Sequence, residues 1–238
     1  MDNDFLELKQ WLSDTKDEPL ERMAGFFEAR LDSYEEHMSR WSGHYKWMAE
    51  LLPEDVRSLL DLGCGTGLEL DCVFDRFPSL EVVGVDLSEG MLSKLKSKHP
   101  DKNLTLFRED YFLLDMGRER FDAVIAFETL HHYTAEKKTQ LFRKIFDCLT
   151  EGGVYLECDY IAVSEEIEKL AFEECGRRRL RDGIADGEFV HFDTPLTLEH
   201  ELNALRAAGF VSAEAVGFLP EDNHTPMIRA IKPYRHEI

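Results

Sequence analysis

The chain has 238 residues, of which 43% are hydrophobic and 32% charged, and its formal net charge at pH 7 is −20. This length suits one large domain with an added cap, and no apolar run approaches the roughly 20 residues of a membrane span. The acidic balance disfavours nucleic acid as a partner, because nucleic-acid binders gain affinity by replacing counterions with Lys and Arg.

The five cysteines are scattered and never occur as C-x-x-C, which predicts reduced thiols rather than a disulfide framework or a structural zinc site. The segment from Met1 to Leu12 is acidic and has no basic region followed by an apolar stretch, so it does not resemble a secretory signal. We therefore expect a cytoplasmic protein with no membrane association.

In chain order, the N-terminal part predicts three helices, at residues 3–12, 17–31 and 35–51. Five apolar segments then alternate with helix-compatible ones, and each has the composition of a buried strand. The predicted strands are residues 59–62, 81–86, 103–107, 121–127 and 154–158. The predicted helices between them are residues 67–77, 88–98 and 135–149.

Local signals mark the ends of several of these elements. Ser88 is a helix N-cap and Pro100 follows the end of that helix, while Glu151-Gly152-Gly153 predicts a break before the fifth strand. Near the C-terminus, a helix at 196–208 is predicted to stop at Gly209. Two strands follow without a helix between them, at 211–218 and 226–232, and so predict a hairpin with one antiparallel strand.

This order of elements predicts an α/β fold. Strands that are apolar on both faces require helices on both sides of a parallel sheet, and right-handed crossovers leave few topologies. We expect a doubly wound, seven-stranded and mostly parallel sheet with one antiparallel strand at the C-terminal end. An N-terminal helical cap, residues 1–52, precedes a domain at 53–238 that carries a substrate-side insertion at about 159–196.

The most informative segment is Asp61-Leu62-Gly63-Cys64-Gly65-Thr66-Gly67, which follows an apolar run. It predicts a buried strand that turns abruptly into a helix. Glycine tolerates positive φ and lacks a Cβ, so the backbone can approach a ligand closely while helix-start N–H groups face it. These features point to a nucleotide-like cofactor.

Acidic residues follow the next two strands, at the edge of the sheet where ligands bind in open α/β folds. Asp86 lies about 20 residues beyond the glycine turn, where a carboxylate can accept hydrogen bonds from both ribose hydroxyls. Asp110 could accept a hydrogen bond from an adenine amino group, with Tyr111 or Leu87 against the ring. Taken singly, each acid could be only a helix cap or a solvated loop end.

A dinucleotide is the weaker interpretation. Its G-x-G-x-x-G/A pattern requires a small residue at position 68, where this chain has Leu68. Asp61 and Glu69 flank the turn, so the local charge suits a cationic adenosine cofactor better than a pyrophosphate.

Residues 59–67, 82–88, 110–111, 121–132 and 149–156 resemble the successive motifs of the class I S-adenosylmethionine-dependent methyltransferases of the small-molecule type. The resemblance covers about residues 55–232, and it implies a Rossmann-like fold with S-adenosyl-L-methionine as cofactor and S-adenosyl-L-homocysteine as product. It implies that Asp61 and the glycine turn hold the methionine end and that the Phe127 carbonyl holds the methionyl portion. The implied cofactor-binding set is Tyr34, Asp61, Gly63, Cys64, Gly65, Gly67, Asp86, Leu87, Met91, Asp110, Tyr111 and Phe127.

Methyl transfer requires alignment of the nucleophile, exclusion of water and, for some acceptors, a base. His132 or His131 after the fourth strand is the candidate base, and adjacent histidines point in different directions, so one of them at most faces the methyl group. Arginines in the insertion could bind a carboxylate or phosphate of a small substrate. The candidate substrate-binding residues are Glu128, Tyr133, Tyr160, Arg177, Arg178 and His191.

Several alternatives stay open at this point. Glu128 and His131 form an E-x-x-H string that also occurs in metal sites, but we expect no metal because such strings arise easily in an acidic chain with nine histidines. The main expectation is methyl transfer to an O, N or C atom of a small molecule by a monomer or homodimer. A tRNA-base-modifying enzyme and a non-catalytic cofactor-binding sensor or partner protein are the alternatives.

Overall fold

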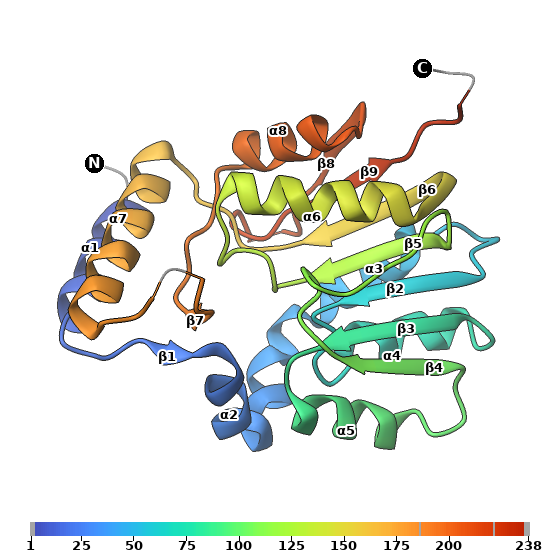
Figure 1. The fold of residues 1–238 in the computed structure, drawn as a ribbon, viewed down its shortest axis with the longest axis horizontal. Coiled ribbons are helices and arrows are strands. Elements are labelled where there is room, and N and C mark those ends of the chain that lie inside the picture. The colour runs from blue at the N-terminus through green and yellow to red at the C-terminus, as the bar shows by residue number, and fades with distance from the viewer. Residues whose placement is uncertain (1–2, 186, 221, 236–238) are drawn as a thin grey trace.

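The computed structural model describes residues 3–185, 187–220 and 222–235, so the outermost residues of both predicted units lie outside the described part. Seven strands form the main sheet (Figure 1). They are β2 (Ser58–Leu62), β3 (Glu81–Asp86), β4 (Leu104–Arg108), β5 (Phe121–Phe127), β6 (Leu149–Cys158), β8 (Ser212–Gly217) and β9 (Met227–Ile231).

The helices are α1 (Asn3–Asp14), α2 (Met23–Met38), the 3₁₀ turn η1 (Ser39–Trp41), α3 (Ser42–Leu51), α4 (Leu68–Arg76), α5 (Glu89–Lys98), α6 (Ala135–Cys148), α7 (Glu165–Asp182) and α8 (Leu198–Ala208). Helices lie on both sides of the main sheet, and α1, α2 and α7 lie beyond the carboxyl ends of its parallel strands (Figure 1). Two short strands, β1 (Glu21–Arg22) and β7 (Val190–His191), form a separate antiparallel pair.

The strand order of the main sheet is β4-β3-β2-β5-β6-β9-β8. Strands β2 to β6 pair in parallel, while β9 runs antiparallel to both of its neighbours. The order reverses between β2 and β5, which is the switch point where α/β folds bind ligands beyond the carboxyl ends of their strands. The predicted fold class, including the single antiparallel strand, is confirmed.

Alternation of side chains along the strands explains the two helical layers. Leu60 and Val124 belong to a core with Phe142 of α6 and Leu205 of α8. Leu59, one residue earlier, belongs to the opposite core, which contains side chains of α3, α4 and α5. Side chains alternate between the two faces of a strand, and both faces of the central strands are buried under helices. These strands are therefore apolar at consecutive positions.

Two N-terminal predictions need correction. The helix expected at 17–31 begins only at Met23, because Glu21 and Arg22 pair with Val190 and His191 across the chain. The local pattern of apolar and polar residues cannot reveal a contact between segments so far apart in the sequence. The helix expected at 35–51 is interrupted by η1, which separates α2 from α3.

The expected break at Glu151-Gly152-Gly153 is also wrong, because β6 continues through it. Gly152 has φ 76°, and the register against β5 shifts between Phe121 and Ala123, so the two glycines form an irregularity within the strand. Glycine allows this bend without ending the ladder.

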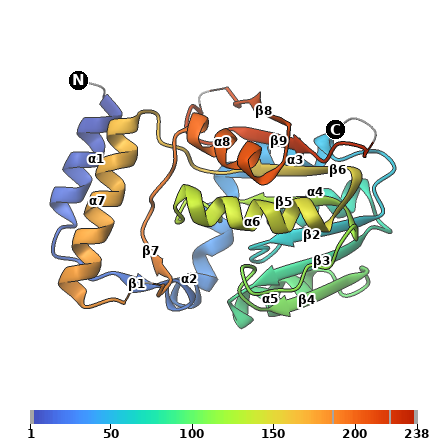
Figure 2. The ribbon, with the colours of Figure 1, turned by 45° about the horizontal axis from the view of Figure 1, so that its top comes forward.

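Helices α1 and α7 pack side by side at one end of the molecule in both ribbon views (Figures 1 and 2). Arg178 of α7 is buried between them and donates to the Leu12 carbonyl at 3.2 Å and to Thr15 Oγ1 at 2.9 Å. Its Nε also donates to Glu174 at 2.8 Å. This arginine therefore connects α7 to the C-terminal end of α1.

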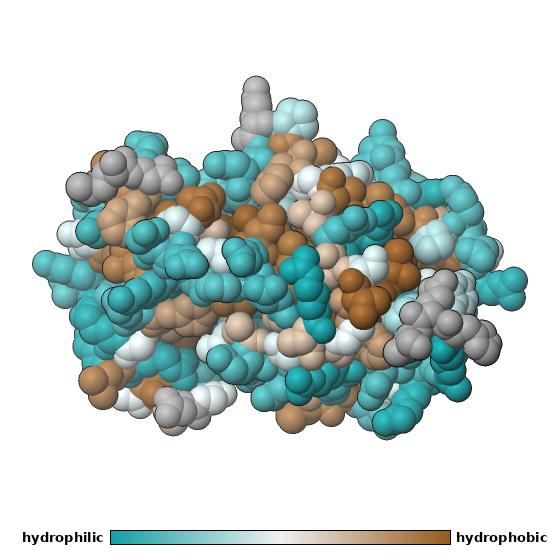
Figure 3. Space-filling view, turned by 90° about the horizontal axis from the view of Figure 1, so that it is seen from above, coloured by the Kyte–Doolittle hydropathy of each residue, from teal (hydrophilic) through white to brown (hydrophobic). Residues whose placement is uncertain are grey.

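Figure 3 shows one face on which hydrophilic side chains are interspersed with smaller hydrophobic patches.

Among the described helices, none combines the length and the apolar character needed to cross a bilayer.

A buried cluster of one lysine and two glutamates connects α6 and α8 to β6 of the main sheet. Lys138 of α6 lies 2.5 Å from Glu201 of α8 and 3.8 Å from Glu157 of β6, and all three side chains are almost fully buried. Burial and the neighbouring carboxylate raise the pKa of Glu157 well above its ordinary value, while burial also raises that of Glu201. The positive charge of Lys138 offsets part of the free-energy cost of burying the two carboxyl groups.

We expect Lys138→Met to destabilise the protein by about 3 kcal/mol or more at pH 7, since it leaves buried carboxylates without a cation. A raised folded-state pKa means that the folded chain binds protons more readily than the unfolded chain, so acidification favours folding between the unfolded and folded pKa values. The deficit of the variant should therefore shrink from pH 7.5 to pH 5, as measured by urea unfolding. Lys169→Met, at an exposed pair on α7, is the control and should change stability by less than about 0.5 kcal/mol. A deficit that stays constant with pH would contradict this account.

Candidate active site

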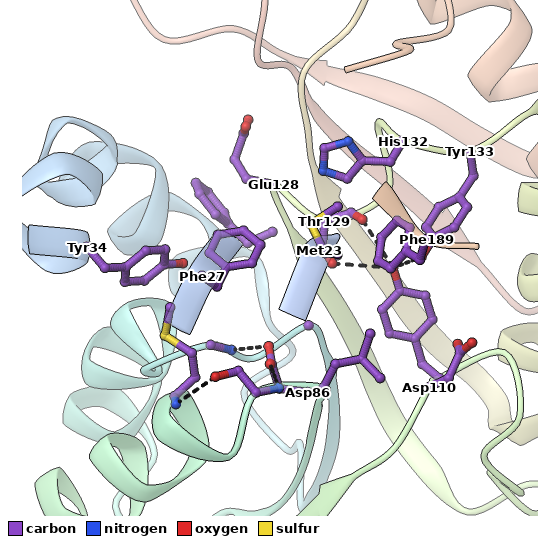
Figure 4. Close-up of a pocket in the computed structure, with 17 residues that line it drawn as sticks. Met23, Phe27, Tyr34, Asp86, Asp110, Glu128, Thr129, His132, Tyr133 and Phe189 are labelled. Atoms are coloured by element: carbon purple, nitrogen blue, oxygen red, sulfur yellow. Dashed lines mark hydrogen bonds between the residues drawn. The ribbon is translucent and has the colours of Figure 1, made fainter. Parts of the chain in front are cut away.

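A pocket lies at the carboxyl ends of β2, β3 and β5, beside the switch point (Figure 4). It contains about 670 Å³ of empty space when the mouth that opens to solvent is included. The residues that line it are Met23, Phe27, Tyr34, Gly63, Gly65, Asp86, Leu87, Ser88, Met91, Asp110, Tyr111, Phe127, Glu128, Thr129, His132, Tyr133 and Phe189.

The floor of the pocket is the glycine turn after β2. Gly63 and Gly65 have φ values of 74° and 47°, which L side chains rarely adopt. A Cβ at Gly63 would lie 2.2 Å from Thr129 Oγ1, and one at Gly65 would lie 3.2 Å from the Tyr34 hydroxyl. Both conformation and space therefore require glycine here, and the bare backbone faces the pocket.

Asp86 connects this turn to the next helix. Its carboxylate accepts from the Gly65 N–H at 3.1 Å and from the Ser88 N–H at 2.7 Å (Figure 4). Burial raises the pKa of Asp86, although these N–H groups partly offset the effect. Each oxygen retains a lone pair, so the carboxylate can still accept from a vicinal diol.

Behind the turn lies a second carboxylate, Asp61, which is fully buried and has no hydrogen-bond partner at either oxygen. Burial raises its pKa well above the ordinary value, and the charge of Glu69 adds to the effect. Burial also raises the pKa of Glu69 to about 7. An unpaired buried carboxylate is costly, so a cation bound nearby would stabilise this region.

Aromatic side chains form the opposite wall. The Tyr111 hydroxyl donates to the Thr129 carbonyl at 3.1 Å and lies 3.2 Å from the Tyr133 hydroxyl. Tyr133 stacks on Phe189, with ring centroids 4.9 Å apart. Asp110 lies beside this wall, and one of its oxygens accepts from the Phe112 N–H at 2.8 Å, so it caps a turn as well as lining the pocket.

Helix α2 covers the pocket from the N-terminal side. Met23, Phe27 and Tyr34 all face it, and the Tyr34 hydroxyl points toward the glycine turn (Figure 4). Burial raises the pKa of Tyr34, so the hydroxyl stays protonated and can donate. The helical segment is thus placed to exclude water from a bound ligand.

Glu128 follows β5 and has an unusual backbone, with φ 47°. A non-glycine residue in this region costs free energy and is often found at functional sites. Its Oε1 is buried without a hydrogen-bond partner, and its carboxylate points away from Asp86 (Figure 4). Burial raises the pKa of Glu128 to about 8.

The pKa values of the two histidines after Glu128, His131 and His132, are shifted in opposite directions. Burial would lower the pKa of His131, but the carboxylates of Asp159, 2.5 Å away, and Asp193 raise it well above its ordinary value. His132 lines the pocket, and burial with the adjacent His131 charge lowers its pKa to about 3. Its Nδ1 lies 3.1 Å from the Phe192 carbonyl, which can only accept, so the proton of neutral His132 is on Nδ1 and Nε2 is an acceptor.

The structure brings most of the predicted cofactor residues together. Nine of the twelve line the pocket, while Asp61, Cys64 and Gly67 lie outside the lining. Cys64 is buried, and Gly67 is the N-cap of α4.

The predicted substrate residues are divided. Glu128 and Tyr133 line this pocket, whereas Tyr160 lines a neighbouring cavity, as does His131, one of the two candidate bases. Arg177 and Arg178 line neither cavity, and both pair with Glu174 on α7, so a role for them in substrate binding stays a prediction.

His191 also lies outside the lining of both cavities. It stacks on Phe26 with ring centroids 3.5 Å apart, and its ring is 5.5 Å from that of His132. It therefore supports the wall behind the pocket.

Sequence reasoning missed Asp159 and Asp193, which set the charge of His131. Asp159 directly follows β6, the same strand-end signal that identified Asp86 and Asp110. Asp193 lies in an irregular segment with no comparable signal. Glu128, His131 and Asp159 lie close enough together to hold a metal ion, but hydrogen bonds and ion pairs already account for this arrangement.

A doubly wound sheet of this order, with a glycine turn and acidic residues after successive strands, defines the class I S-adenosylmethionine-dependent methyltransferases. Residues 59–153 match the sequence model of a family described as a methyltransferase domain, and the fold is that of the S-adenosylmethionine-dependent methyltransferases.

Relatives with assigned names include carboxy-S-adenosyl-L-methionine synthases over most of the chain and malonyl-[acyl-carrier protein] O-methyltransferases over less than half of it. The chain is 28% identical over 217 residues to a carboxy-S-adenosyl-L-methionine synthase of Campylobacter concisus, covering 83% of this chain and 91% of the relative. A methyltransferase structure from Mesorhizobium loti aligns with a TM-score of 0.57 at 24% identity, covering 79% of this chain and 97% of that one. The structure of human N-acetylserotonin methyltransferase in complex with S-adenosylmethionine aligns with a TM-score of 0.57 at 17% identity. The alignment covers 82% of this chain and 53% of the human one.

These structural likenesses establish the fold. The chain spans 56% and 57% of the length of two further similar structures, one from Nostoc punctiforme and one of the methyltransferase SibL. S-adenosylmethionine is the cofactor of the class.

We expect ¹⁵N NMR at pH 6 to show His131 protonated on both nitrogens and His132 neutral with its proton on Nδ1, because the carboxylates stabilise only the His131 charge. Variants His131→Asn and His132→Asn provide the assignments. A His132 signal that titrates between pH 5 and pH 7 would contradict the proposed electrostatics.

Proposed function

We propose that this protein transfers the methyl group of S-adenosylmethionine to an O, N or C atom of a small molecule by in-line displacement. The observation that carries the proposal is the pocket at the switch point, in which carboxylates surround the space available to a cationic adenosine cofactor. The sulfonium already makes the methyl group electrophilic, so the protein needs only to align the reactants, exclude water and accept a proton where one is released.

The proposed roles follow from position. Asp86 accepts from the ribose hydroxyls, and Asp110 accepts from the adenine amino group through the oxygen not used in its turn. Asp61 lies behind Gly63 and its unpaired oxygens favour the methionine amino group, which is cationic. Tyr34 closes the pocket over the glycine turn.

A base role fits Glu128 better than either histidine. A general base works best when its pKa is close to the working pH. His131 is already protonated, and His132 has a pKa of about 3, whereas that of Glu128 is about 8. We therefore propose Glu128 as the proton acceptor and His132 Nε2 as a hydrogen-bond acceptor that orients a substrate.

A carboxylated cofactor is a second candidate, because several relatives are named carboxy-S-adenosyl-L-methionine synthase. Such a ligand adds a carboxylate near the sulfur, which an arginine or lysine would normally balance. Within the described pocket lining there is no lysine or arginine, and Glu128 and Asp86 are acidic. The pocket charge therefore favours the methylated cofactor.

The other two alternatives differ in what they require. A tRNA substrate conflicts with a net charge of −20, and Arg177 and Arg178 are both paired with Glu174. A non-catalytic sensor would bind the cofactor equally well, so formation of S-adenosylhomocysteine in the presence of an acceptor separates it from an enzyme.

We expect Asp86→Asn to weaken S-adenosylmethionine binding at least tenfold, about 1.4 kcal/mol, because an amide offers one acceptor oxygen in place of two. Isothermal titration calorimetry measures the effect. Asp101→Asn, at an exposed position after α5, is the matched control and should leave the affinity unchanged.

The same titrations should include carboxy-S-adenosylmethionine and NAD. The proposal expects S-adenosylmethionine to bind at least tenfold more tightly than either. Preferential binding of the carboxylated form would support the synthase alternative, and preferential binding of NAD would overturn the choice of cofactor.

A further inference from the structure

A second cavity lies on the other side of Glu128 from the glycine turn. It contains about 1330 Å³ of empty space including its wide mouth, and it lies between the N-terminal helix, η1, the loops after β5 and β6, and α7. The residues that line it are Asp4, Glu7, Leu8, Trp11, Trp41, Glu128, His131, Tyr160, Val163, Ile167, Ala171, Asp193, Pro195, His224 and Thr225.

Glu128 joins this cavity to the cofactor pocket, because it lines both. Its carboxylate points away from Asp86, toward the side opposite the ribose site (Figure 4). Its buried Oε1 has no hydrogen-bond partner in the protein, although such atoms are almost always paired. A ligand group that donates to this oxygen would complete the site.

The charge of the cavity is negative. Asp4, Glu7 and Asp193 contribute carboxylates, Glu128 adds a further negative charge when it is ionised, and the described lining has neither lysine nor arginine. The His131 charge is balanced by Asp159 at 2.5 Å and Asp193 at 3.5 Å, so it does not cancel the remaining acids. A positively charged guest is favoured over an anion.

The rest of the lining is apolar or aromatic. Trp11, Trp41 and Tyr160 contribute aromatic rings, and Leu8 and Ile167 are among the aliphatic neighbours. Aromatic faces attract ammonium groups as well as apolar surface, so the cavity combines the two features that a cation with an apolar body requires.

We propose that this second cavity binds the methyl acceptor, and that the acceptor is a small-molecule amine with an apolar body, bound as its ammonium ion beside Glu128. This inference rests on the proposed function and specifies its substrate class. Glu128 then lies where the acceptor nitrogen must meet the methyl group.

The chemical step balances without any further reactant. The ammonium ion transfers one proton to the Glu128 carboxylate, and the free amine lone pair attacks the methyl carbon as its bond to sulfur breaks. The products are the N-methylated ammonium ion, neutral S-adenosylhomocysteine and protonated Glu128, which releases its proton to solvent.

The first test is a binding series on the full chain saturated with S-adenosylhomocysteine. The probes are 2-phenylethylamine, 2-phenylethanol and 3-phenylpropionate, which share an aromatic body and differ in charge. We expect the amine to bind at least tenfold more tightly than the alcohol and the carboxylate to bind least. Equal affinities, a preference for the carboxylate, or no binding by any of the three would overturn the proposal.

The second test places the amine in this cavity rather than elsewhere. The double variant Asp4→Asn/Glu7→Gln should weaken amine binding about threefold to tenfold, while the affinity for S-adenosylmethionine stays unchanged. Glu28→Gln, at an exposed position on α2 outside both cavities, is the matched control and should change neither. Unchanged amine binding in the double variant would exclude this cavity.

The third test concerns turnover of 2-phenylethylamine, measured as S-adenosylhomocysteine formed. Glu128→Gln should lower kcat about 100-fold or more with little change in cofactor affinity, and Glu128→Asp should recover part of the loss. Cofactor binding without amine turnover in the unaltered protein would refute the amine proposal alone, whereas loss of cofactor binding itself would refute the proposed function.

Discussion

The left-handed turn between β2 and α4 is the constraint on which the site depends. Gly63 and Gly65 take positive φ values there, and the neighbouring Thr129 and Tyr34 leave little room for a Cβ at either position. The same turn buries Asp61 behind it and gives the Gly65 N–H to Asp86. A side chain in this turn would therefore disturb the floor of the pocket, the Tyr34 side chain above it and the Asp86 carboxylate together.

Electrostatics make the site receptive to a cation. Burial raises the pKa of Asp61, Glu69 and Glu128, which means that the empty protein holds these carboxyl groups at a cost. A bound sulfonium and α-amino group would favour their ionised forms, so cofactor binding and proton release are linked. The chain is acidic as a whole, and a few of its buried carboxyl groups, Asp61, Glu69 and Glu128, lie in or near the pocket.

Much of the fold could be predicted from the sequence, because it depends on local patterns. The limits of β3 and β5 match the predicted strands, and the helix cap at Ser88 is present. Asp86 and Asp110 could be identified because both follow apolar strands, and parallel strands bring their carboxyl ends to one edge. The family resemblance agreed with these residues.

Features that depend on contacts between distant segments could not be predicted. The pairing of β1 with β7, which delays the start of α2, is one example. Arg178 looked suitable for a substrate anion, but it fastens α1 to α7. The choice between His131, His132 and Glu128 depends on burial and on Asp159 and Asp193, whose positions are set by the tertiary fold.

The most direct test of the account is a crystal structure with S-adenosylhomocysteine. It should place the ribose hydroxyls within hydrogen-bond distance of Asp86, the adenine beside Asp110, and the sulfur toward Glu128. Density for the ligand at another location, or an unchanged pocket at saturating ligand with Tyr34 and Phe27 filling the space, would contradict it.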